Sequence, residues 1–547
     1  MNSDYDVVVI GGGVNGTGIA RDAAMRGMKV LLVEKEDFSY GATGACSGMI
    51  HGGLRYLLND VHTTRKSCVD SGYIQSIAPH LLFRIPLLTP IPHKFMAEPM
   101  ETYFEVYDRF VEYKRGKPHT RLTAEEARKL EPGLVPDLIG AITTDEYGID
   151  TFRLTTANAL SAAQAGATVR NHCEVTALLR AEGGRVVGVR LRDKISGLVE
   201  EIGARLVMNA GGPWGQKVAG LADAKVKMRP AKGVHLTLDR RISNVGIIAN
   251  AIDGRNIFVL PHENTSIVGT TDDDYYGDLD DIPITEDEVE YLLQGIAHVF
   301  PAIRRARILR AWAGIRPTLY KWGPDEDGLS RDHKVVDHES EGAPGLLSIT
   351  GGKLAAYRMM SEDAVDHIAG KLGVGEPCRT HVEPLPGGDS VPDAGDLARE
   401  FGVPAHAARR LVYRQGSRAL QVLELVRENP SWGKLLCRCE PVLEAEARFV
   451  IRTEWVHDLS DLRRRTRLGM GPCQGARCAA RAALVLAEEK GETPEAALAY
   501  LEGFLQRRFK GKAPVLAGAQ LAQEEVNQAV HQCLGRLQEY MEGRRCR

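Results

Sequence analysis

The first 35 residues alternate two short apolar runs with one helical pattern. Val7–Ile10 is an uninterrupted β-branched run, which is typical of a strand buried on both faces. After three glycines, apolar residues recur at helical spacing within residues 15–26, and Gly27 ends that pattern. Val30–Val33 repeats the buried-strand pattern. These positions predict a β-strand, an α-helix and a second, parallel strand at the start of the chain.

Strand-like and helical runs continue to alternate as far as about residue 380. Further strands are expected at Val186–Leu191, Leu206–Met208, Ile257–Leu260 and Leu346–Ile349, and exposed loops at Gly323–Gly328 and His338–Pro344. The segment from Glu383 to Asp396 holds three prolines and three glycines and marks a domain boundary. After it, Ala, Leu, Arg and Glu dominate, as they do in helices. The pattern predicts an α/β fold followed by a helical region.

Composition narrows the class of protein. Hydrophobic residues make up 44% and charged residues 26%, which is ordinary globular usage and excludes a mainly disordered chain or a disulfide-rich scaffold. At about 150 residues per domain, the length predicts three to four domains. The net charge of -3 argues against a nucleic-acid partner. We expect no secretory signal and no membrane-spanning helix, and therefore a cytoplasmic protein.

The glycines after the first strand fit the G-x-G-x-x-G pattern of dinucleotide-binding loops. Gly11 allows the tight turn, Gly13 lets the backbone approach a pyrophosphate, and Gly16 lets the helix pack closely on the strand. The phosphates then lie at a helix N-terminus, which favours negative charge. Glu34 ends the second strand, where an acid binds ribose hydroxyls and disfavours NADP. The loop predicts a nucleotide cofactor; a glycine turn without a ligand is the alternative.

The segment after the second strand favours FAD over NAD. Residues 41–53 are rich in glycine, alanine and hydroxyl side chains, which suits backbone that runs along a bound cofactor. A flexible surface loop is the alternative interpretation. Gly351, Gly352 and Lys353 follow a late apolar strand, where their N–H groups could lie under a flavin ring.

Four of the ten cysteines lie close together in the helical region, as Cys437-x-Cys439 and Cys473-x4-Cys478. In a cytosolic chain such grouping indicates metal or redox chemistry more than disulfides. An iron–sulfur cluster is held by four thiolates, whereas structural zinc usually takes cysteine pairs separated by two to four residues. The spacing resembles that of bacterioferritin-associated-ferredoxin-like domains and favours a [2Fe-2S] cluster. Zinc and unliganded thiols remain the alternatives.

Two other features of this region have more than one interpretation. Arg463–Arg465 and Arg467 form a basic run just before Cys473. It is either a solvated basic face or a set of cations that offset cluster charge or dock an acidic partner. Residues 485–547 form a helical tail that packs on the core or docks a partner, with these apolar anchors: Phe504, Leu505, Phe509, Leu516 and Leu521.

Five stretches match one known family. They are Ile50–Tyr56, Asn209–Trp214, Gly269–Asp272, Gly314–Pro317 and Ile349–Leu354. On these residues the chain resembles the FAD-dependent glycerol-3-phosphate dehydrogenases, within the amino-acid-oxidase-like flavoproteins. The segments 150–155 and 307–311 and the cysteine region are similar to the catalytic A subunits of the anaerobic branch. Residues 53–55 and His235 are more similar to the aerobic, single-subunit branch.

The resemblance implies a fold and a division of the chain. It implies an α/β fold with an FAD-binding, Rossmann-like domain, an interleaved mixed-sheet substrate domain and a helical C-terminal [2Fe-2S] domain. The boundaries expected are residues 1–383 for the oxidoreductase, 384–431 for a linker and helical segment, 432–485 for the [2Fe-2S] domain and 486–547 for the helical tail.

The resemblance also implies a reaction and the residues that perform it. The reaction is oxidation of sn-glycerol 3-phosphate to dihydroxyacetone phosphate, with electrons passing from FAD through the [2Fe-2S] cluster towards a quinone. The catalytic residues expected are His51, His235, Arg316 and Lys353, and the substrate ligands are Arg55, Tyr56, Thr270 and Arg331. FAD would be bound by Gly11, Gly13, Asn15, Gly16, Glu34, Thr43, Ser47, Val175, Gly211, Gly351, Gly352 and Leu354.

The role of each polar group follows from the chemistry of this substrate. Guanidinium groups suit a phosphate, which assigns Arg55 and Arg331 to it. A base with a pKa near the working pH takes the hydroxyl proton, so His51 is the first candidate and His235 the second. Arg316 and Lys353 would stabilise the developing alkoxide and the anionic region of the reduced flavin.

Three other functions are compatible with parts of this pattern. The first is an oxidase that passes electrons to oxygen, although an oxidase needs no exit cluster. The second is the same scaffold acting on a hydroxy acid or an amino acid. The third is a non-enzymatic electron-transfer subunit, which would not require His51, Arg316 and Lys353. The expected partners are electron-transfer subunits leading to a membrane quinone, with the chain peripheral on the cytoplasmic face of the inner membrane.

Overall fold

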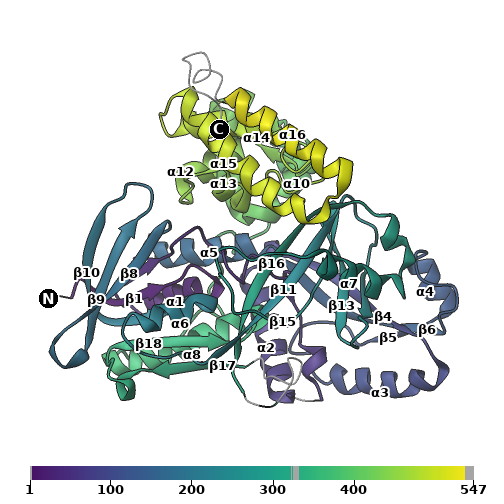
Figure 1. Cartoon of the computed structure of the whole chain (residues 1–547), viewed down its shortest axis with the longest axis horizontal. Helices are drawn as coiled ribbons and strands as arrows, with labels where there is room; N and C mark the ends of the chain where they lie inside the picture. The colour runs from purple at the N-terminus through teal and green to yellow at the C-terminus, as the bar shows by residue number, and fades with distance from the viewer. Residues whose placement is uncertain (1–2, 59, 322, 324–331, 536–547) are drawn as a thin grey trace.

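A computed structural model of the chain describes residues 3–58, 60–321, 323 and 332–535, with side chains as far as residue 530. Two β-sheets and a helical domain make up the described part (Figure 1). Residues 324–328 of the loop expected at Gly323–Gly328 lie outside the described residues, and so does Arg331.

The first sheet has eight strands and contains the N-terminal unit. Its order is β17-β18-β10-β1-β2-β7, with the β8–β9 hairpin attached to β10, and β1 pairs in parallel with β2 and β10. Its strands are β1 (Tyr5–Ile10), β2 (Val30–Val33), β7 (Thr168–Arg170), β8 (Cys173–Arg180), β9 (Val186–Asp193), β10 (Val199–Asn209), β17 (His333–Asp337) and β18 (Leu346–Gly351). The helices of this unit are α1 (Val14–Met25), α5 (Thr151–Gln164), α6 (Gly215–Gly220) and α8 (Tyr357–Leu372).

The strand and helix predictions for this sheet are confirmed. Val7, Val9, Val30 and Leu32 are fully buried, and they share a core with apolar residues of α1, α5 and α8. The four later strand predictions fall within β9, β10, β13 and β18. The exposed loop expected at 338–344 is wrong in part, because it contains a short 3-10 turn and its residues His338 and Ala343 are buried.

The second sheet has ten strands and is mostly antiparallel. Its order is β15-β11-β14-β13-β12-β4-β6-β3, with β16 on β11 and β5 on β6. Its strands are β3 (Met49–Ile50), β4 (Leu82–Ile91), β5 (Thr120–Thr123), β6 (Gly140–Ile149), β11 (Met228–Leu238), β12 (Gly246–Asn250), β13 (Asn256–His262), β14 (Thr265–Gly269), β15 (Asp273–Asp274) and β16 (Ile308–Leu319). The helices α3 (Ala97–Asp108), α4 (Ala124–Leu130) and α7 (Glu286–Ala297) belong to the same half of the molecule, whereas α2 (Val61–Ile77) packs against α8.

Both sheets are built from segments that are interleaved along the chain, as expected for a cofactor domain and a mixed-sheet substrate domain. The chain passes between the sheets several times before residue 352, so neither half is a continuous segment. Loops from the first sheet therefore face one side of the second sheet, and the space between them forms the cavity described below.

The helical domain follows α8 and contains one hydrophobic core that extends from Leu397 to Leu505. The three segments expected after residue 383 thus share a single core, and their division into separate units stays a prediction. Its elements are α9 (Ala394–Phe401), α10 (Ala405–Gln415), α11 (Ala419–Glu428), β19 (Leu435–Cys437), β20 (Val442–Leu443), α12 (Glu444–Thr453), α13 (Leu459–Thr466), α14 (Ala479–Glu489), α15 (Pro494–Lys512) and α16 (Gly518–Gly535). Among the expected apolar anchors, Phe504 and Leu505 are buried, and Phe509, Leu516 and Leu521 are half-buried.

The basic run before Cys473 lies mostly at the contact between the helical domain and the first sheet. Arg464 and Arg465 both contact Asp37, and Arg467 contacts Asp150. Burial of the Asp37 carboxyl opposes its ionisation. The attraction of Arg464 and Arg465 outweighs the effect of burial and holds the pKa of Asp37 well below its usual range. These three arginines are therefore docking residues, not a solvated face. Figure 1 shows the helical domain lying over α5 and β16.

Among the helices that the structure describes, none is long and apolar enough to cross a bilayer.

Candidate active site

The loop between β1 and α1, where the motif predicts a pyrophosphate, requires glycine at two of its positions. Gly11 has a φ of +116°, and a Cβ there would lie 2.5 Å from the carbonyl oxygen of Ala210. A Cβ on Gly16 would lie 1.8 Å from the carbonyl oxygen of Gly11, so only glycine allows α1 to approach the strand this closely. Gly13 precedes the first residue of α1. The residues present therefore fit a dinucleotide.

Other expected cofactor ligands surround this loop. Thr43 Oγ1 accepts the N–H of Val14 at 3.1 Å, which ties the small-residue segment to the N-terminus of α1. The backbone nitrogen of Gly211 lies 3.1 Å from the position of a Gly11 Cβ. Val175 lies on β8, the hairpin strand that begins beside the end of β2.

Glu34 ends β2 beside the glycine loop, as expected, and already has two backbone contacts. Its Oε2 accepts the N–H of Gly12 at 2.6 Å, and its Oε1 accepts the N–H of Glu36 at 2.9 Å. Burial raises the pKa of this carboxyl, and the two N–H donors oppose that shift. Each carboxylate oxygen has a further lone pair, so binding of ribose hydroxyls is compatible with these contacts and stays a prediction.

A cavity of about 1000 Å³ lies between the loops of the first sheet and one face of the second. Because side chains alternate along a strand, alternate residues of five strands of this sheet face this space. The floor residues are Leu87 and Thr89 of β4, Ile248 and Asn250 of β12, Asn256 and Phe258 of β13, Gly233 and His235 of β11, and Gly314 and Arg316 of β16, with Thr270 after β14. The opposite wall includes Val14, Asn15, Thr43, Ser47, His51, Arg55, Tyr56, Gly351, Gly352, Lys353 and Leu354.

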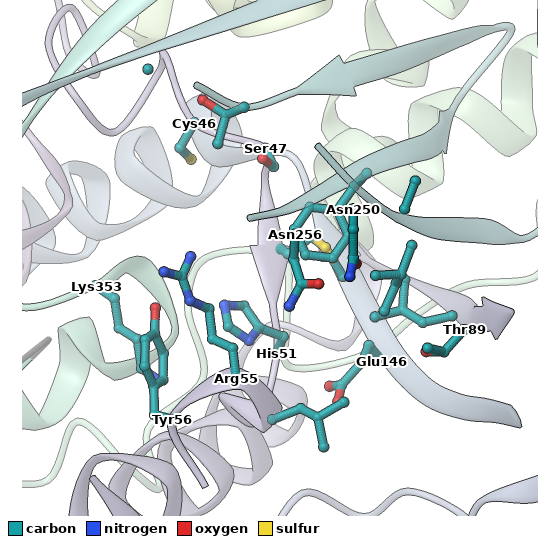
Figure 2. Close-up of a pocket in the computed structure, with 18 of the residues that line it drawn as sticks. Cys46, Ser47, His51, Arg55, Tyr56, Thr89, Glu146, Asn250, Asn256 and Lys353 are labelled. Carbon is teal, nitrogen blue, oxygen red and sulfur yellow. The ribbon is translucent and has the colours of Figure 1, made fainter. Parts of the chain in front are cut away.

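Most expected catalytic and substrate residues converge in this cavity. Figure 2 shows His51, Arg55, Tyr56 and Lys353 on one side of it, with Asn250, Asn256 and Thr89 towards the other. Lys353 Nζ lies 4.4 Å from the centre of the Tyr56 ring, and Arg55 lies 5.3 Å from the same ring. The aromatic ring holds two cations near each other, which a phosphate or another anion would bind.

Gly53 makes this approach possible. Its φ is +78°, and a Cβ there would lie 2.6 Å from Lys353 Nζ. The segment that begins at His51 thus turns sharply, so that Arg55, which follows β3, and Lys353, which follows β18, meet at one place.

The hydrogen bonds of His51 determine which of its nitrogens carries a proton. Gly53 N–H donates to His51 Nδ1 at 3.0 Å, so the neutral ring has its proton on Nε2. Burial lowers the pKa of His51 to about 3, and the cations Lys353, Arg55 and Lys114 add to the shift. The neutral ring therefore presents a donor, not a proton acceptor, at Nε2. This arrangement weakens the expectation that His51 is the base.

His235 is more deeply buried and reaches the cavity beside Ser47. Its Nε2 lies 2.9 Å from Ser47 Oγ, and its ring stacks on Trp312 with centroids 5.3 Å apart and an interplanar angle of 9°. Its Nδ1 is buried and has no hydrogen-bond partner among the described residues. Burial lowers the pKa of His235 to about 3, with a smaller contribution from Arg316. His235 is thus a neutral ring with fixed orientation.

Arg316 and Thr270 are joined by hydrogen bonds. Arg316 Nη2 donates to Thr270 Oγ1 at 3.0 Å, and Nη1 contacts Asp272 Oδ1 at 2.7 Å. Arg316 is therefore anchored at the cavity wall with a fixed direction, which suits electrostatic stabilisation of an oxygen that gains charge.

The four clustered cysteines meet in the helical domain as two pairs. A hydrogen bond from Cys478 lowers the pKa of the Cys437 thiol, and backbone N–H groups of Gly469, Glu440 and Cys439 act in the same direction. Burial raises the pKa of Cys439, whose thiol hydrogen-bonds with that of Cys473. Within the described residues, no three His, Cys, Asp or Glu side chains are arranged to hold a metal ion. The thiols are thus adjacent in pairs.

Several residues of the cavity were not expected from the sequence. They are Glu146, Thr89, Asn250 and Asn256 on the second sheet, and Trp312 behind His235. Each lies on a strand at an alternating position, and no short motif marks any of them. Only the register between strands brings these residues together. Asn250 and Asn256, for example, lie directly opposite each other on β12 and β13.

Comparison with known families matches two parts of the chain. Residues 6–358 match the family described as "FAD dependent oxidoreductase", and residues 378–497 match the "C-terminal domain of alpha-glycerophosphate oxidase".

Individual proteins match nearly the whole chain. The A subunit of the anaerobic glycerol-3-phosphate dehydrogenase of Escherichia coli is 37% identical over 97% of this chain and 96% of its own length. A glycerol-3-phosphate dehydrogenase of Synechocystis is 32% identical over 86% of this chain and 90% of its own. Among solved structures, the glycerol-3-phosphate dehydrogenase of Bacillus halodurans complexed with FAD has a TM-score of 0.75 and 27% identity, covering 94% of this chain and 96% of that one. The expected α/β flavoprotein fold with a helical C-terminal domain is confirmed, and the chain belongs to the FAD-dependent glycerol-3-phosphate dehydrogenase family.

Proposed function

We propose that this protein oxidises sn-glycerol 3-phosphate to dihydroxyacetone phosphate with FAD as its cofactor. The observation that carries the proposal is the convergence of Arg55, Lys353 and Arg316 on one cavity that also contains His51 and borders the glycine loop. A small dianionic substrate with an oxidisable alcohol matches three cations and a neutral imidazole. Relatives that are named for this activity match 97% and 86% of the chain.

The phosphate is bound by Arg55, with Tyr56 as a further donor. The guanidinium stays charged at every working pH and can make two parallel hydrogen bonds. Arg331, the second phosphate ligand expected, lies outside the described residues and stays a prediction. FAD, when bound, would supply the hydride acceptor for this oxidation.

The chain must hold and move the hydroxyl proton. His51 Nε2–H donates to the substrate oxygen, because Gly53 occupies Nδ1. We assign the proton-accepting role to His235 through Ser47, whose hydroxyl bridges the cavity and His235 Nε2. Arg316 and Lys353 stabilise negative charge that develops on that oxygen.

Anaerobic stopped-flow mixing of the flavin-loaded protein with sn-glycerol 3-phosphate tests the reaction. We expect the flavin absorbance to bleach at a saturable rate, and dihydroxyacetone phosphate to form in equal amount. No bleaching in flavin-containing protein would refute the substrate assignment. A panel of hydroxy acids and amino acids would then identify a different substrate, and rapid reoxidation by oxygen would indicate an oxidase.

We further propose that Cys437, Cys439, Cys473 and Cys478 hold a [2Fe-2S] cluster, which would carry electrons one at a time. Two adjacent pairs of thiols, with N–H groups directed at the Cys437 sulfur, support a two-iron cluster over a single zinc ion. Iron and acid-labile sulfide analysis, with an electron paramagnetic resonance spectrum of the reduced protein, tests it. Two irons and two sulfides per chain are expected, and one zinc per chain would refute it.

The electron acceptor belongs to the same proposal. The Escherichia coli relative is named as one subunit of its enzyme, which supports partner subunits that carry electrons towards a membrane quinone. We propose that the chain binds peripherally, on the cytoplasmic face of the inner membrane, through such partners. Co-purification from solubilised membranes tests this, and full activity with quinone in the absence of any partner would refute the need for them.

A further inference from the structure

A buried ion pair lies behind the loop that carries His51, and the proposed chemistry does not use it. Lys114 Nζ contacts Glu146 Oε1 at 2.9 Å, and their side chains are 1% and 2% exposed. Glu146 Oε2 accepts the N–H of Gly52 at 3.1 Å, the residue directly after His51. An ionised acceptor strengthens such a bond and gives it a fixed direction.

The surroundings of Gly52 leave this peptide little freedom. Tyr107 OH donates to Glu146 Oε1 at 2.7 Å, and Cys68 Sγ donates to the carbonyl of Gly52 at 3.4 Å. A Cβ on Gly52 would lie 2.1 Å from the hydroxyl of Tyr107 and 2.6 Å from Cys68 Sγ. The N–H of Gly52 is therefore held by the carboxylate of Glu146, and its carbonyl is held by the thiol of Cys68.

The restraint on Gly52 also affects His51, through the peptide group that joins Gly52 to Gly53. Peptide groups are planar, so fixing the N–H and carbonyl of Gly52 restricts the direction of the next N–H, that of Gly53. Gly53 N–H is the group that donates to His51 Nδ1. The position of Glu146 thus determines which nitrogen of His51 carries the proton and where Nε2 points.

We propose that Glu146 is a positioning residue that fixes the orientation and tautomer of His51 through the N–H groups of Gly52 and Gly53. The charge of Lys114 balances that of Glu146, since a lone buried carboxylate is strongly unfavourable. Glu146 also lines the cavity, below His51 in Figure 2. The catalytic consequence rests on the function proposed above, whereas the effect on the loop does not.

The double variant Glu146→Leu/Lys114→Met removes both charges together, which avoids an unpaired buried ion. In the full-length, flavin-loaded protein, hydrogen–deuterium exchange of residues 49–57 should become at least about 10-fold faster, because the N–H of Gly52 loses its acceptor. The limiting rate of flavin reduction should fall about 10- to 100-fold, because a displaced His51 no longer meets the substrate oxygen. Apparent substrate affinity should change much less, since Thr64 still holds the carbonyl of Gly53 ahead of Arg55.

An equally buried ion pair in the helical domain provides the control. Arg414 and Glu446 contact each other at 2.7 Å with side chains 1% and 0% exposed. Arg414→Met/Glu446→Leu should leave both the exchange of residues 49–57 and the reduction rate unchanged. Glu146→Gln, which keeps the shape of the side chain, serves as a second variant if the double variant does not fold, and it should show smaller changes in the same direction.

The proposal is overturned if the Glu146 variants match the parent protein in exchange and rate, or if the control pair causes the same losses. If the parent protein fails to reduce its flavin with glycerol 3-phosphate, only the proposed function is refuted. Faster exchange of residues 49–57 in the Glu146 variants would still support the role of Glu146 in fixing this loop.

Discussion

Replacement of His51 by glutamine and by leucine distinguishes a hydrogen-bond donor from a general base. Glutamine keeps an N–H donor at about the position of Nε2, whereas leucine keeps only bulk. If His51 donates to the substrate oxygen, leucine should lower the limiting rate of flavin reduction about 10²- to 10³-fold, the usual effect of losing one such donor. Glutamine should lower it less than about 10-fold. A general base would be lost in both variants, with equal decreases of about 10²- to 10⁴-fold.

The pH dependence gives an independent check of the same reasoning. The pKa of His51 is lowered to about 3, so at pH 7 only about one ring in 10⁴ carries the second proton. We therefore expect no inflection from His51 in the limiting rate between pH 5 and 9, measured by anaerobic stopped-flow across that range. Equal losses in the two variants, or an inflection near pH 6 that disappears in His51→Gln, would refute the donor role.

Three other changes test the remaining parts of the architecture. Gly16→Ala should abolish FAD retention, because its Cβ would lie 1.8 Å from a carbonyl oxygen; the ratio of flavin to protein absorbance measures this. Asp37→Asn leaves Arg465 buried without its carboxylate and should cost about 3–5 kcal/mol in urea unfolding at pH 7. Because the folded pKa of Asp37 is depressed, this loss should shrink as the pH falls below about 4, where the unfolded carboxyl is protonated. Trp312→Leu removes the ring that orients His235 and should lower the limiting reduction rate about 10-fold while the flavin content is unchanged.

The sequence predicted best what depends on neighbouring residues. The βαβ unit and the glycine loop are local patterns, and the structure places both of them as expected. Arg465 shows the opposite case. Its partner, Asp37, lies 428 positions earlier, so no local pattern separates a docking cation from a solvated one.

Glu146 and the protonation of His51 illustrate a second limit of prediction from the sequence. An acid on a strand is usually solvated, and only the pairing of β6 with β3 and β4 brings Glu146 beneath the His51 loop. The tautomer of His51 depends on one backbone N–H, that of Gly53, which donates to Nδ1. Only those cavity residues that lie in motifs could thus be predicted, and the protonation of His51 required the backbone geometry.

The turn between β13 and β14 connects the cavity with the cysteines. His262 Nδ1 accepts a hydrogen bond from Arg467 of the helical domain, and Asn264 Nδ2 donates to the carbonyl of Cys439 at 2.7 Å. At the other end of β14, Gly269 packs against the ring of His235.

The length of β14 bears on how electrons would leave the cavity. A strand rises about 3.4 Å per residue, so the five steps from Asn264 to Gly269 span about 17 Å. Cys439 lies in the helical domain, beside the turn at one end of β14. A cluster there would therefore lie about one strand length from the cavity wall. The helical domain thus contacts the second sheet at this turn and the segment after β2 of the first sheet through Arg464 and Arg465. If the four cysteines hold the proposed cluster, these two contacts would keep it at a fixed distance from the cavity.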